Sequence, residues 1–280
     1  MLALSLGLCA ALAWGIHDIC VRQVAQGSAV LPLLIVMLMT GTLLLLPLAL
    51  VFGDWHEMNA IDGGLSVLSG LIYICACIGL YKAFGIGPVA LVAPIVGAYP
   101  ILSVGWAAAS GQIVPVDQWI AVVVVLCGVA LVSILSDEQA GNGSRVSAVG
   151  WAVLAAVGFA GTFATGQAAT ASGDELPVIF ISRLTASVVC LTLLMLARSP
   201  KRPDRSAWPY LVLMALLDTT AHGIVLASGT LQRAEFAAVG ASIFGVATII
   251  LARLILREPM RTAQWVGVAI TFSGIGYLAL

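Results

Sequence analysis

Charged side chains are scarce in this chain of 280 residues, which has 12 Lys and Arg and 13 Asp and Glu, or 9% in all. Hydrophobic residues make up 61% of the sequence, and the mean hydropathy is +1.10. A water-soluble domain of this length needs many more charged residues to cover its surface. The composition therefore predicts an integral membrane protein that crosses the bilayer several times.

Several sequence signatures of enzymes and of nucleic-acid-binding proteins are absent. No Gly-x-x-x-x-Gly-Lys-Ser/Thr loop is present to hold phosphates, and no His-Glu-x-x-His is present to hold zinc. The net charge is −1, and no basic segment is interleaved with aromatic residues, so we expect no nucleic-acid partner. All six cysteines lie in apolar runs and are interpreted as packing residues. We expect no metal, no other cofactor and no catalytic residues.

Ten apolar runs are long enough to cross a bilayer, each crossing needing about 20 residues. The polar connections between them, the longest at 54–62, 136–147 and 198–207, are too short to fold alone. We therefore expect an all-α integral membrane protein with ten transmembrane helices. Their predicted positions are 2–21, 29–52, 65–84, 88–110, 117–135, 147–171, 176–197, 208–228, 234–256 and 262–280.

One offset relates the two halves of the chain. It is 264 − 118 = 146 residues, and it pairs Gln118-Trp119 with Gln264-Trp265, Gly15 with Gly161, and Gly128 with Gly274. A repeat of five spans is odd, so its copy must lie in the membrane with the opposite orientation. The sequence predicts two inverted five-helix repeats, at 1–136 and 147–280, as in many secondary transporters.

The fourth predicted span contains three prolines. Pro88 suits a first helical turn, whereas Pro94 and Pro100 lie inside the apolar run and each removes a helical hydrogen bond. A carbonyl freed in this way needs another partner in the bilayer. We therefore expect an irregular helix between residues 88 and 110.

Three motifs resemble the EamA family of the drug/metabolite transporter superfamily. They are Ala13-Trp14-Gly15, the run from Gly87-Pro88-Val89-Ala90 to Tyr99-Pro100, and Arg257-Glu258-Pro259 followed by Gln264-Trp265-Val266-Gly267. The resemblance covers both halves, and the first half departs from it in having Gln112 where the second has Glu258. It implies a multi-pass transporter of small metabolites in a bacterial inner membrane, in contact with membrane lipids, as a monomer or a homodimer.

Lys and Arg gather at cytoplasmic helix ends. If the N-terminus is outside, only Arg233 lies outside, and Arg183 lies within a span. The ten cations on the cytoplasmic side are then Arg22, Lys82, Arg145, Arg198, Lys201, Arg202, Arg205, Arg253, Arg257 and Arg261. The charge count favours both termini outside, whereas the resemblance implies both termini inside.

Ionisable groups within spans cost roughly 2.5 to 3.5 kcal/mol each, so they tend to face the interior of a bundle and mark a pathway. The candidates are Asp218 and His222, one helical turn apart, together with Arg183, His17 and Asp18. The offset maps four of them onto apolar residues, pairing Arg183 with Met37, Asp218 with Ile72, His222 with Ala76 and Asp18 with Ala164. The charged set therefore breaks the symmetry of the repeat.

Two interpretations of this charged set are open. Arg183 can hold an anionic group of a substrate while Asp218 and His222 bind a cationic group or a proton, with Asp18 as a further proton-coupling candidate. Alternatively, Arg183 and Asp218 form an ion pair that only fixes helix packing, and Asp18 pairs with Arg22 one turn away. Candidates for the cavity wall are Trp14, Tyr73, Tyr81, Tyr99, Thr162, Thr165, Gln167, Thr219, Ser242 and Phe244.

The sequence leads to one functional prediction with two rivals. We expect a secondary transporter that moves a small organic solute, such as an amino acid, nucleoside, amine or drug-like compound, by alternating access, through either proton exchange or facilitated diffusion. The first rival is a flippase for lipids or lipid-linked sugars on the same fold. The second is an intramembrane aspartyl protease built on Asp18 and Asp218, which lack the flanking residues expected of that class.

Overall fold

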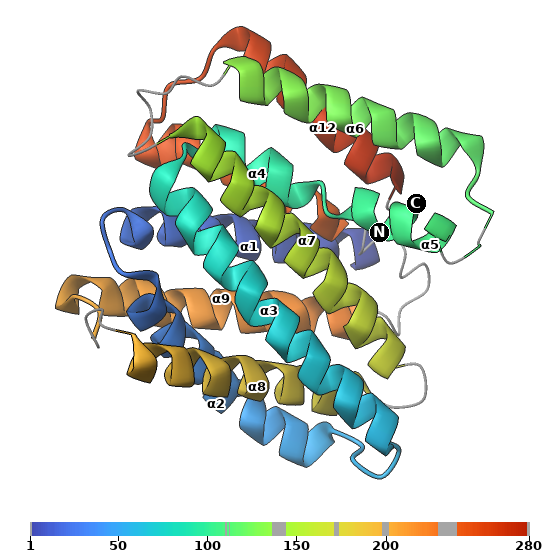
Figure 1. The fold of residues 1–280 in the computed structure, drawn as a ribbon, viewed down its shortest axis with the longest axis vertical. Helices are drawn as coiled ribbons and strands as arrows, with labels where there is room; N and C mark the ends of the chain where they lie inside the picture. Colours follow the sequence, from blue (N-terminus) through green and yellow to red (C-terminus); the bar gives the residue numbers. More distant parts are fainter. Residues whose placement is uncertain are drawn as a thin grey trace.

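The computed structural model describes residues 2–109, 111, 113–135, 144–170, 174–197, 202–228 and 240–278. Four residues used in the sequence comparison and the charge count, Gln112, Arg198, Lys201 and Arg233, lie outside these ranges. Within the described ranges the regular elements are all helices, packed into a bundle (Figure 1). The predicted all-α class is therefore confirmed.

The helices follow the predicted apolar runs closely. Six of the described helices, α1, α2, α3, α6, α7 and α8, are long and apolar enough to cross a membrane. The elements are α1 (Leu2–Ala25), α2 (Val30–Phe52), α3 (Ala60–Ile86), α4 (Val89–Gly97), α5 (Pro100–Ala109), α6 (Val116–Leu135), α7 (Arg145–Ala169), α8 (Glu175–Leu196), the 3₁₀ turn η2 (Arg205–Ala207), α9 (Trp208–Ser228), α11 (Phe244–Leu251), η3 (Ala252–Leu256) and α12 (Thr262–Leu278).

Helix α3 begins five residues earlier than the apolar run predicts. Asn59 caps it, because its side-chain oxygen accepts hydrogen bonds from the backbone N–H of Ile61 at 2.8 Å and of Asp62 at 3.0 Å. Asp62 completes the capping box by accepting from the backbone N–H of Asn59 at 3.2 Å. Polar residues that read as a connection in the sequence thus form the first helical turn.

The predicted irregularity in the fourth span is present at Pro100 and not at Pro94. Pro94 lies inside α4, while the chain turns at Ala98 and Tyr99 before Pro100 begins α5. In this turn the N–H of Ala98 bonds to the carbonyl of Ile95 at 3.2 Å. Pro100 takes the position where a missing N–H costs nothing, because the first N–H groups of a helix have no partner within it.

A second break lies at the corresponding place in the other half. The chain is helical from 240 to 242, turns at Ile243, and continues as α11 and then as the π-helix η3. Ile243 lies 243 − 97 = 146 residues after Gly97, the last residue of α4. Arg257 then adopts a left-handed backbone with φ of 54°. Discontinuous helices at matching positions of two halves are a recognised sign of a transporter's binding site.

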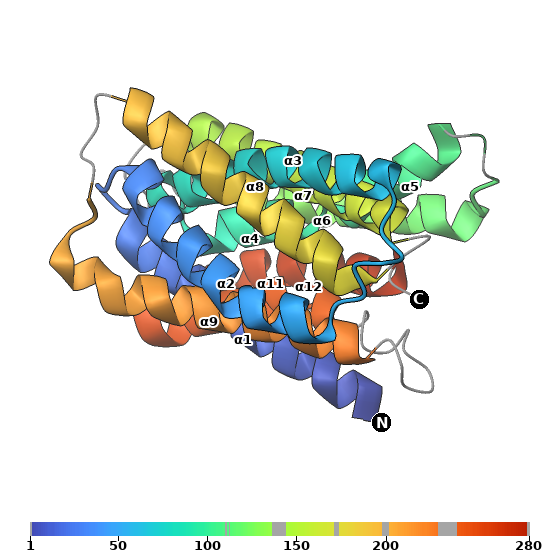
Figure 2. The same cartoon turned by 90° about the horizontal axis from the view of Figure 1, so that it is seen from below.

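Helix pairing repeats the same relation between the halves. Helix α3 packs along α7, and their counterparts α9 and α1 also pack together. The pairs α2 with α8 and α6 with α12 each join counterparts directly, and Figure 1 shows α6 beside α12 at one edge of the bundle. The first residues of α1 and the last of α12 lie at the same end of the bundle in both views (Figures 1 and 2).

Small residues allow α6 and α12 to approach closely. A Cβ atom on Gly128 would lie 2.6 Å from the backbone N of Thr271 and 2.8 Å from the carbonyl oxygen of Gly267. A Cβ atom on Gly274 would lie 3.1 Å from the carbonyl of Ala121. Backbones in such close contact gain dispersion energy, which is a main source of helix association in a membrane.

An ion pair between Arg22 and Glu258 joins the two halves. The Arg22 Nε–H donates to Glu258 Oε1 at 2.8 Å, and its Nη1–H donates to the carbonyl of Phe84 at 2.6 Å. The other carboxylate oxygen of Glu258 accepts from the backbone N–H of Val89 at 2.8 Å, in the first turn of α4. The alternative pairing of Arg22 with Asp18 is therefore wrong, because Arg22 is committed to a residue 236 positions away.

Candidate functional site

The predicted charged cluster of α8 and α9 is present as a buried ion pair. Arg183 and Asp218 are 3% and 5% exposed, and their Nη2 and Oδ2 atoms are in direct contact. Asp218 lies one turn before His222, whose Nδ1 is 2.9 Å from the carbonyl oxygen of Asp218 and 3.3 Å from Arg183 Nη2. Trp14 on α1 donates its indole N–H to the other carboxylate oxygen of Asp218 at 3.2 Å. Three helices from both halves thus meet at one carboxylate.

Aromatic rings enclose this pair. The guanidinium carbon of Arg183 lies 4.8 Å from the centre of the Tyr73 ring, a cation–π contact from α3. Trp14 stands edge-on to His222 at 5.2 Å and to Phe244 at 6.2 Å between ring centres. The rings and the paired charges together replace the hydration that both ions lose when they are buried.

A pocket of about 280 Å³ opens beside the ion pair. Its wall combines aromatic and aliphatic surface with hydroxyl, amide and charged groups, as ligand sites commonly do. The predicted residues Trp14, Tyr73, Thr162, Gln167, Arg183 and His222 line it, with Ser69, Phe163, Gly166, Thr170, Glu175, Val178, Ile179 and Ser182.

The remaining predicted residues lie around this pocket or farther from it. Asp218 is bound to Arg183, and its neighbour Thr219 is on the same helix α9. Tyr99, in the turn between α4 and α5, packs on the lining residue Phe163 with ring centres 5.1 Å apart. Phe244 reaches the site through its contact with Trp14. Three other candidates for the cavity wall lie elsewhere. Tyr81 lines a second pocket, Thr165 is on α7, and Ser242 is the last helical residue before the turn at Ile243.

His17 and Asp18 form a separate buried cluster on α1. They are 5% and 4% exposed, and His17 Nδ1 lies 3.2 Å from Asp18 Oδ1. The hydroxyl of Thr248 on α11 donates to Asp18 Oδ2 at 3.1 Å. Within the described part of the chain, no Lys or Arg forms an ion pair with Asp18. The buried carboxylates Asp218 and Asp18 therefore differ, since Asp218 pairs with the guanidinium of Arg183 and Asp18 contacts a histidine ring and a hydroxyl.

Apart from Asp218 Oδ2, which is held in the ion pair with Arg183, four buried side-chain atoms have no hydrogen-bond partner among the described residues. They are His17 Nε2, Tyr81 Oη, Arg183 Nη1 and Thr219 Oγ1. A Cβ atom built on Gly41 of α2 would lie 3.7 Å from Arg183 Nη1 and 3.5 Å from Thr219 Oγ1, so two of these atoms face the same bare stretch of helix. Each such group costs roughly 1 to 3 kcal/mol.

Three important lining residues, Glu175, Ser182 and Phe163, were not predicted from the sequence. A signal for two of them was present: Glu175, Ile179, Ser182 and Arg183 recur at helical spacing on one face of α8. Ser69 lies one turn before Tyr73 in the same way on α3. Phe163 carries no such signal, because an aromatic residue in an apolar run is indistinguishable from a packing residue.

A second and larger pocket, of about 970 Å³, lies at the opposite ends of the same helices. The first pocket is lined by the end of α7 and the start of α8, and the second by Trp151 near the start of α7 and by Leu193 and Leu196 at the end of α8. The two pockets are thus separated along the length of the bundle.

Comparison with protein families decides what kind of protein this is. The model of the EamA-like transporter family matches twice, at residues 1–134 and 146–280. The chain belongs to the EamA-like transporter family. An EamA-like chain with several long apolar helices is a multi-pass integral membrane protein, so the buried charges of α1, α8 and α9 lie among membrane-spanning helices.

Solved structures support the same fold for this EamA-like transporter. One crystal structure of a protein is similar with a TM-score of 0.66 and 16% sequence identity, covering 98% of this chain and 94% of that one. At this identity the likeness shows the fold alone. A comparison with curated proteins gives no match.

Proposed function

We propose that this EamA-like protein is a secondary transporter that moves a small organic metabolite across a bacterial inner membrane by alternating access. The observation that carries the proposal is the pocket beside the Arg183–Asp218 pair, where α1 and α3 of one half meet α7, α8 and α9 of the other. A solute bound between two halves that can rock against each other is exposed to each side in turn.

The proposed architecture is ten spans in two inverted repeats, at 1–136 and 147–280. Three observations support it: the family model matches each half once, the helix pairs follow the repeat, and the breaks after Gly97 and at Ile243 are 146 residues apart. Both ends of the described chain lie at one end of the bundle (Figure 2), as an even number of spans requires.

The pocket favours a small solute with a flat apolar part and at least one polar group, such as an amino acid, nucleoside or amine. Trp14, Tyr73 and Phe163 supply ring surfaces, while Thr162 and Gln167 supply hydrogen-bonding groups. Arg183 is engaged by Asp218, so an anionic group of the solute reaches it by sharing the guanidinium. Glu175 adds a negative group that suits an amine.

Coupling to protons fits Asp18 better than Asp218 or His222. Arg183 neutralises Asp218, and His222 contacts both members of that ion pair. Asp18 instead contacts His17 and Thr248, so no permanently charged group is held against its carboxylate among the described residues. We expect Asp18→Asn to abolish the pH dependence of transport, and unchanged pH dependence in that variant would exclude the role.

The rival functions have less support. An aspartyl protease needs two carboxylates that share a proton, whereas Asp218 pairs with Arg183 and Asp18 contacts His17 and Thr248. A lipid flippase remains the alternative proposal, because the second pocket is bordered by the exposed residues Leu193 and Leu196. Movement of a fluorescent phospholipid between leaflets of proteoliposomes, faster than in protein-free vesicles, would favour it.

A thermal-shift screen of the detergent-purified protein tests the proposed site. Amino acids, nucleosides and amines are added in turn, and a ligand at 100 times its Kd should add roughly 2.7 kcal/mol of stability. Thr162→Val should weaken the shift. Thr192→Val is the matched control, because both hydroxyls donate to the carbonyl four residues earlier, at 2.9 Å, while Thr192 is exposed on α8.

The screen has two outcomes that would contradict the proposal. One is that no solute class stabilises the wild-type protein. The other is that Thr162→Val and Thr192→Val respond alike, which would place the solute outside this pocket.

A further inference from the structure

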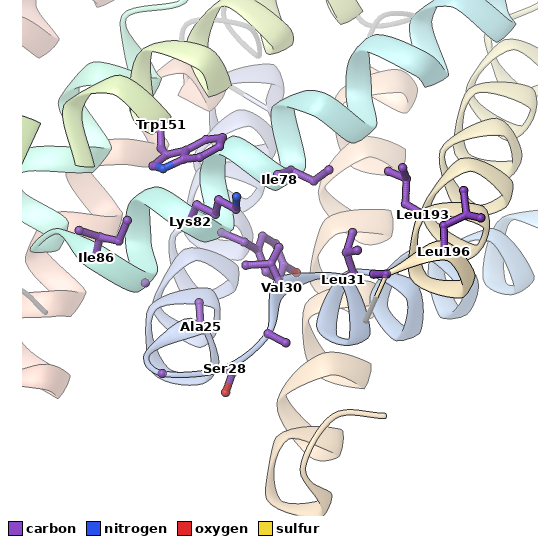
Figure 3. A pocket seen from close by; sticks show the side chains of 15 residues that line it. Ala25, Ser28, Val30, Leu31, Ile78, Lys82, Ile86, Trp151, Leu193 and Leu196 are labelled. Carbon is purple, nitrogen blue, oxygen red and sulfur yellow. The ribbon is translucent and has the colours of Figure 1, made fainter. Parts of the chain in front are cut away.

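Among the described residues that line the second pocket, a single side chain is charged. Lys82 of α3 is that side chain, and Figure 3 shows it between Trp151 and Ile78 with the apolar residues of α2 and α8 around the cavity. Its Nζ lies 4.0 Å from the centre of the Trp151 ring. No Asp or Glu of the described segments forms an ion pair with it. The described wall of the pocket therefore supplies a cation without a counter-charge.

The pocket is open towards the surface that faces lipid. Leu193 and Leu196 of its α8 wall are 39% and 77% exposed, and exposed leucines on a membrane-spanning helix lie against acyl chains. Val30 at the start of α2 and Ala197 just after α8 also line it, so the pocket lies at the ends of spans. Its height in the membrane is therefore that of the lipid headgroups and the upper acyl chains.

Two further features at this level favour a negative group. Helix α2, 23 residues long, begins at the pocket with no side-chain cap on its N-terminal N–H groups, and helix N-termini attract anions. The basic residues Arg202 and Arg205 follow the α8 wall within ten positions of Leu196 in the sequence. On the count of Lys and Arg, this end of the bundle is cytoplasmic, and basic pockets between helices on that side are typical sites for anionic lipid headgroups.

We propose that this second pocket binds an anionic phospholipid, with its phosphate at Lys82 and the start of α2 and an acyl chain along Ile78, Leu193 and Leu196. The volume of about 970 Å³ is of the size that ligand sites have. Trp151 holds the ammonium from the other side, since an indole face stabilises a cation without neutralising it. This site is independent of the solute pocket at the opposite ends of α3, α7 and α8.

The first experiment measures thermal stability of the delipidated full chain in detergent with added phosphatidylglycerol or phosphatidylcholine of identical acyl chains. We expect phosphatidylglycerol to raise the Tm of the wild-type protein. In Lys82→Met the apparent affinity for this lipid should be roughly tenfold lower, as for the loss of one charged contact. Lys82→Arg should retain the shift. Arg253→Gln is the control for a basic residue outside the lining and outside the argument for the anion, and its affinity for phosphatidylglycerol should match that of the wild type.

Three results would overturn the proposal. The two lipids stabilising the wild type equally would show that the negative charge is not recognised. An unchanged affinity in Lys82→Met would show that the phosphate lies elsewhere. The same stabilisation by inorganic phosphate alone would indicate a site for a free anion instead of a lipid.

A second measurement does not depend on the folding of the Lys82 variants. Phosphatidylglycerol with brominated acyl chains should quench the fluorescence of Trp151 in the wild-type protein, measured as the quenching that is lost in Trp151→Phe. Equal quenching of the wild type and Trp151→Phe would place the lipid away from this pocket. Failure of the solute screen would leave both results unaffected, so the two proposals are tested separately.

Discussion

Neutralising Asp218 tests whether the buried ion pair holds α8 and α9 together. In Asp218→Asn the side chain keeps its shape, and its oxygen still accepts from the Trp14 indole. The Arg183 guanidinium, 3% exposed, loses its counter-charge and, among the residues that the structure describes, keeps His222 and the face of Tyr73 as close partners. Leaving one charge of a buried pair uncompensated costs about 3 to 5 kcal/mol.

The reverse substitution should cost less. Arg183→Met leaves the Asp218 carboxylate with two partners, the indole N–H of Trp14 at 3.2 Å and the His222 ring, whose Nδ1 lies 3.4 Å from Oδ1. The offset supplies the choice of Met, since Met37 occupies the equivalent position in the first half. The double variant carries neither charge, and replacing a buried pair with uncharged residues is often neutral.

The assay is thermal unfolding of the four proteins in one detergent at one pH. At roughly 2 to 4 °C per kcal/mol for chains of this size, Asp218→Asn should lower Tm by about 10 °C. Arg183→Met should lower it by less, and the double variant should be more stable than Asp218→Asn alone. Losses that simply add in the double variant would show that the two charges do not interact, and the ion-pair argument would be wrong.

Three further predictions concern other contacts. Gly128→Ala should destabilise the protein by roughly 1 to 3 kcal/mol through overpacking against α12. Gly150→Ala is the control and should not destabilise it, because a Cβ atom there has nothing within 4 Å. Equal Tm values for the two variants would contradict the close packing. Glu258→Gln should lower Tm, because it removes the counter-charge of Arg22. Adding Arg22→Met to this variant should restore part of the lost stability in the same thermal scan, and a further loss would contradict the ion pair. Gly41→Ser should be about 1 kcal/mol more stable than Gly41→Ala, because its hydroxyl can bond the unpaired atoms of the ion-pair site, and identical Tm values would show that those atoms have other partners.

Much of the fold follows from local properties of the sequence. A span is recognised from about 20 consecutive apolar residues, without any knowledge of its neighbours, and the helices observed in the structure follow these runs to within a few residues. The break before Pro100 is local for the same reason, since a missing N–H acts within one helical turn. Asp218 and Arg183 could likewise be chosen as site candidates from local information, because a charge in an apolar run is visible in the sequence alone.

The start of α3 shows where such local rules fail. Hydropathy places the helix at 65, while the capping box of Asn59 and Asp62 extends it to Ala60. Hydrogen bonds to a helix end depend on the identity of two polar residues, and a hydropathy average does not register them. The cap is itself a sequence pattern, so the start of α3 could have been predicted from the sequence.

Partner choice, by contrast, was decided only by the tertiary structure. Arg22 has Asp18 one turn away and nevertheless pairs with Glu258, which the folding of the second half brings to it. Phe163 joins the pocket wall and Tyr99 packs on it because α7 passes the turn after α4. The apolar runs determined that the chain spans a membrane. Which buried charges meet depended on how the helices pack, because a contact between residues far apart in sequence leaves no local pattern.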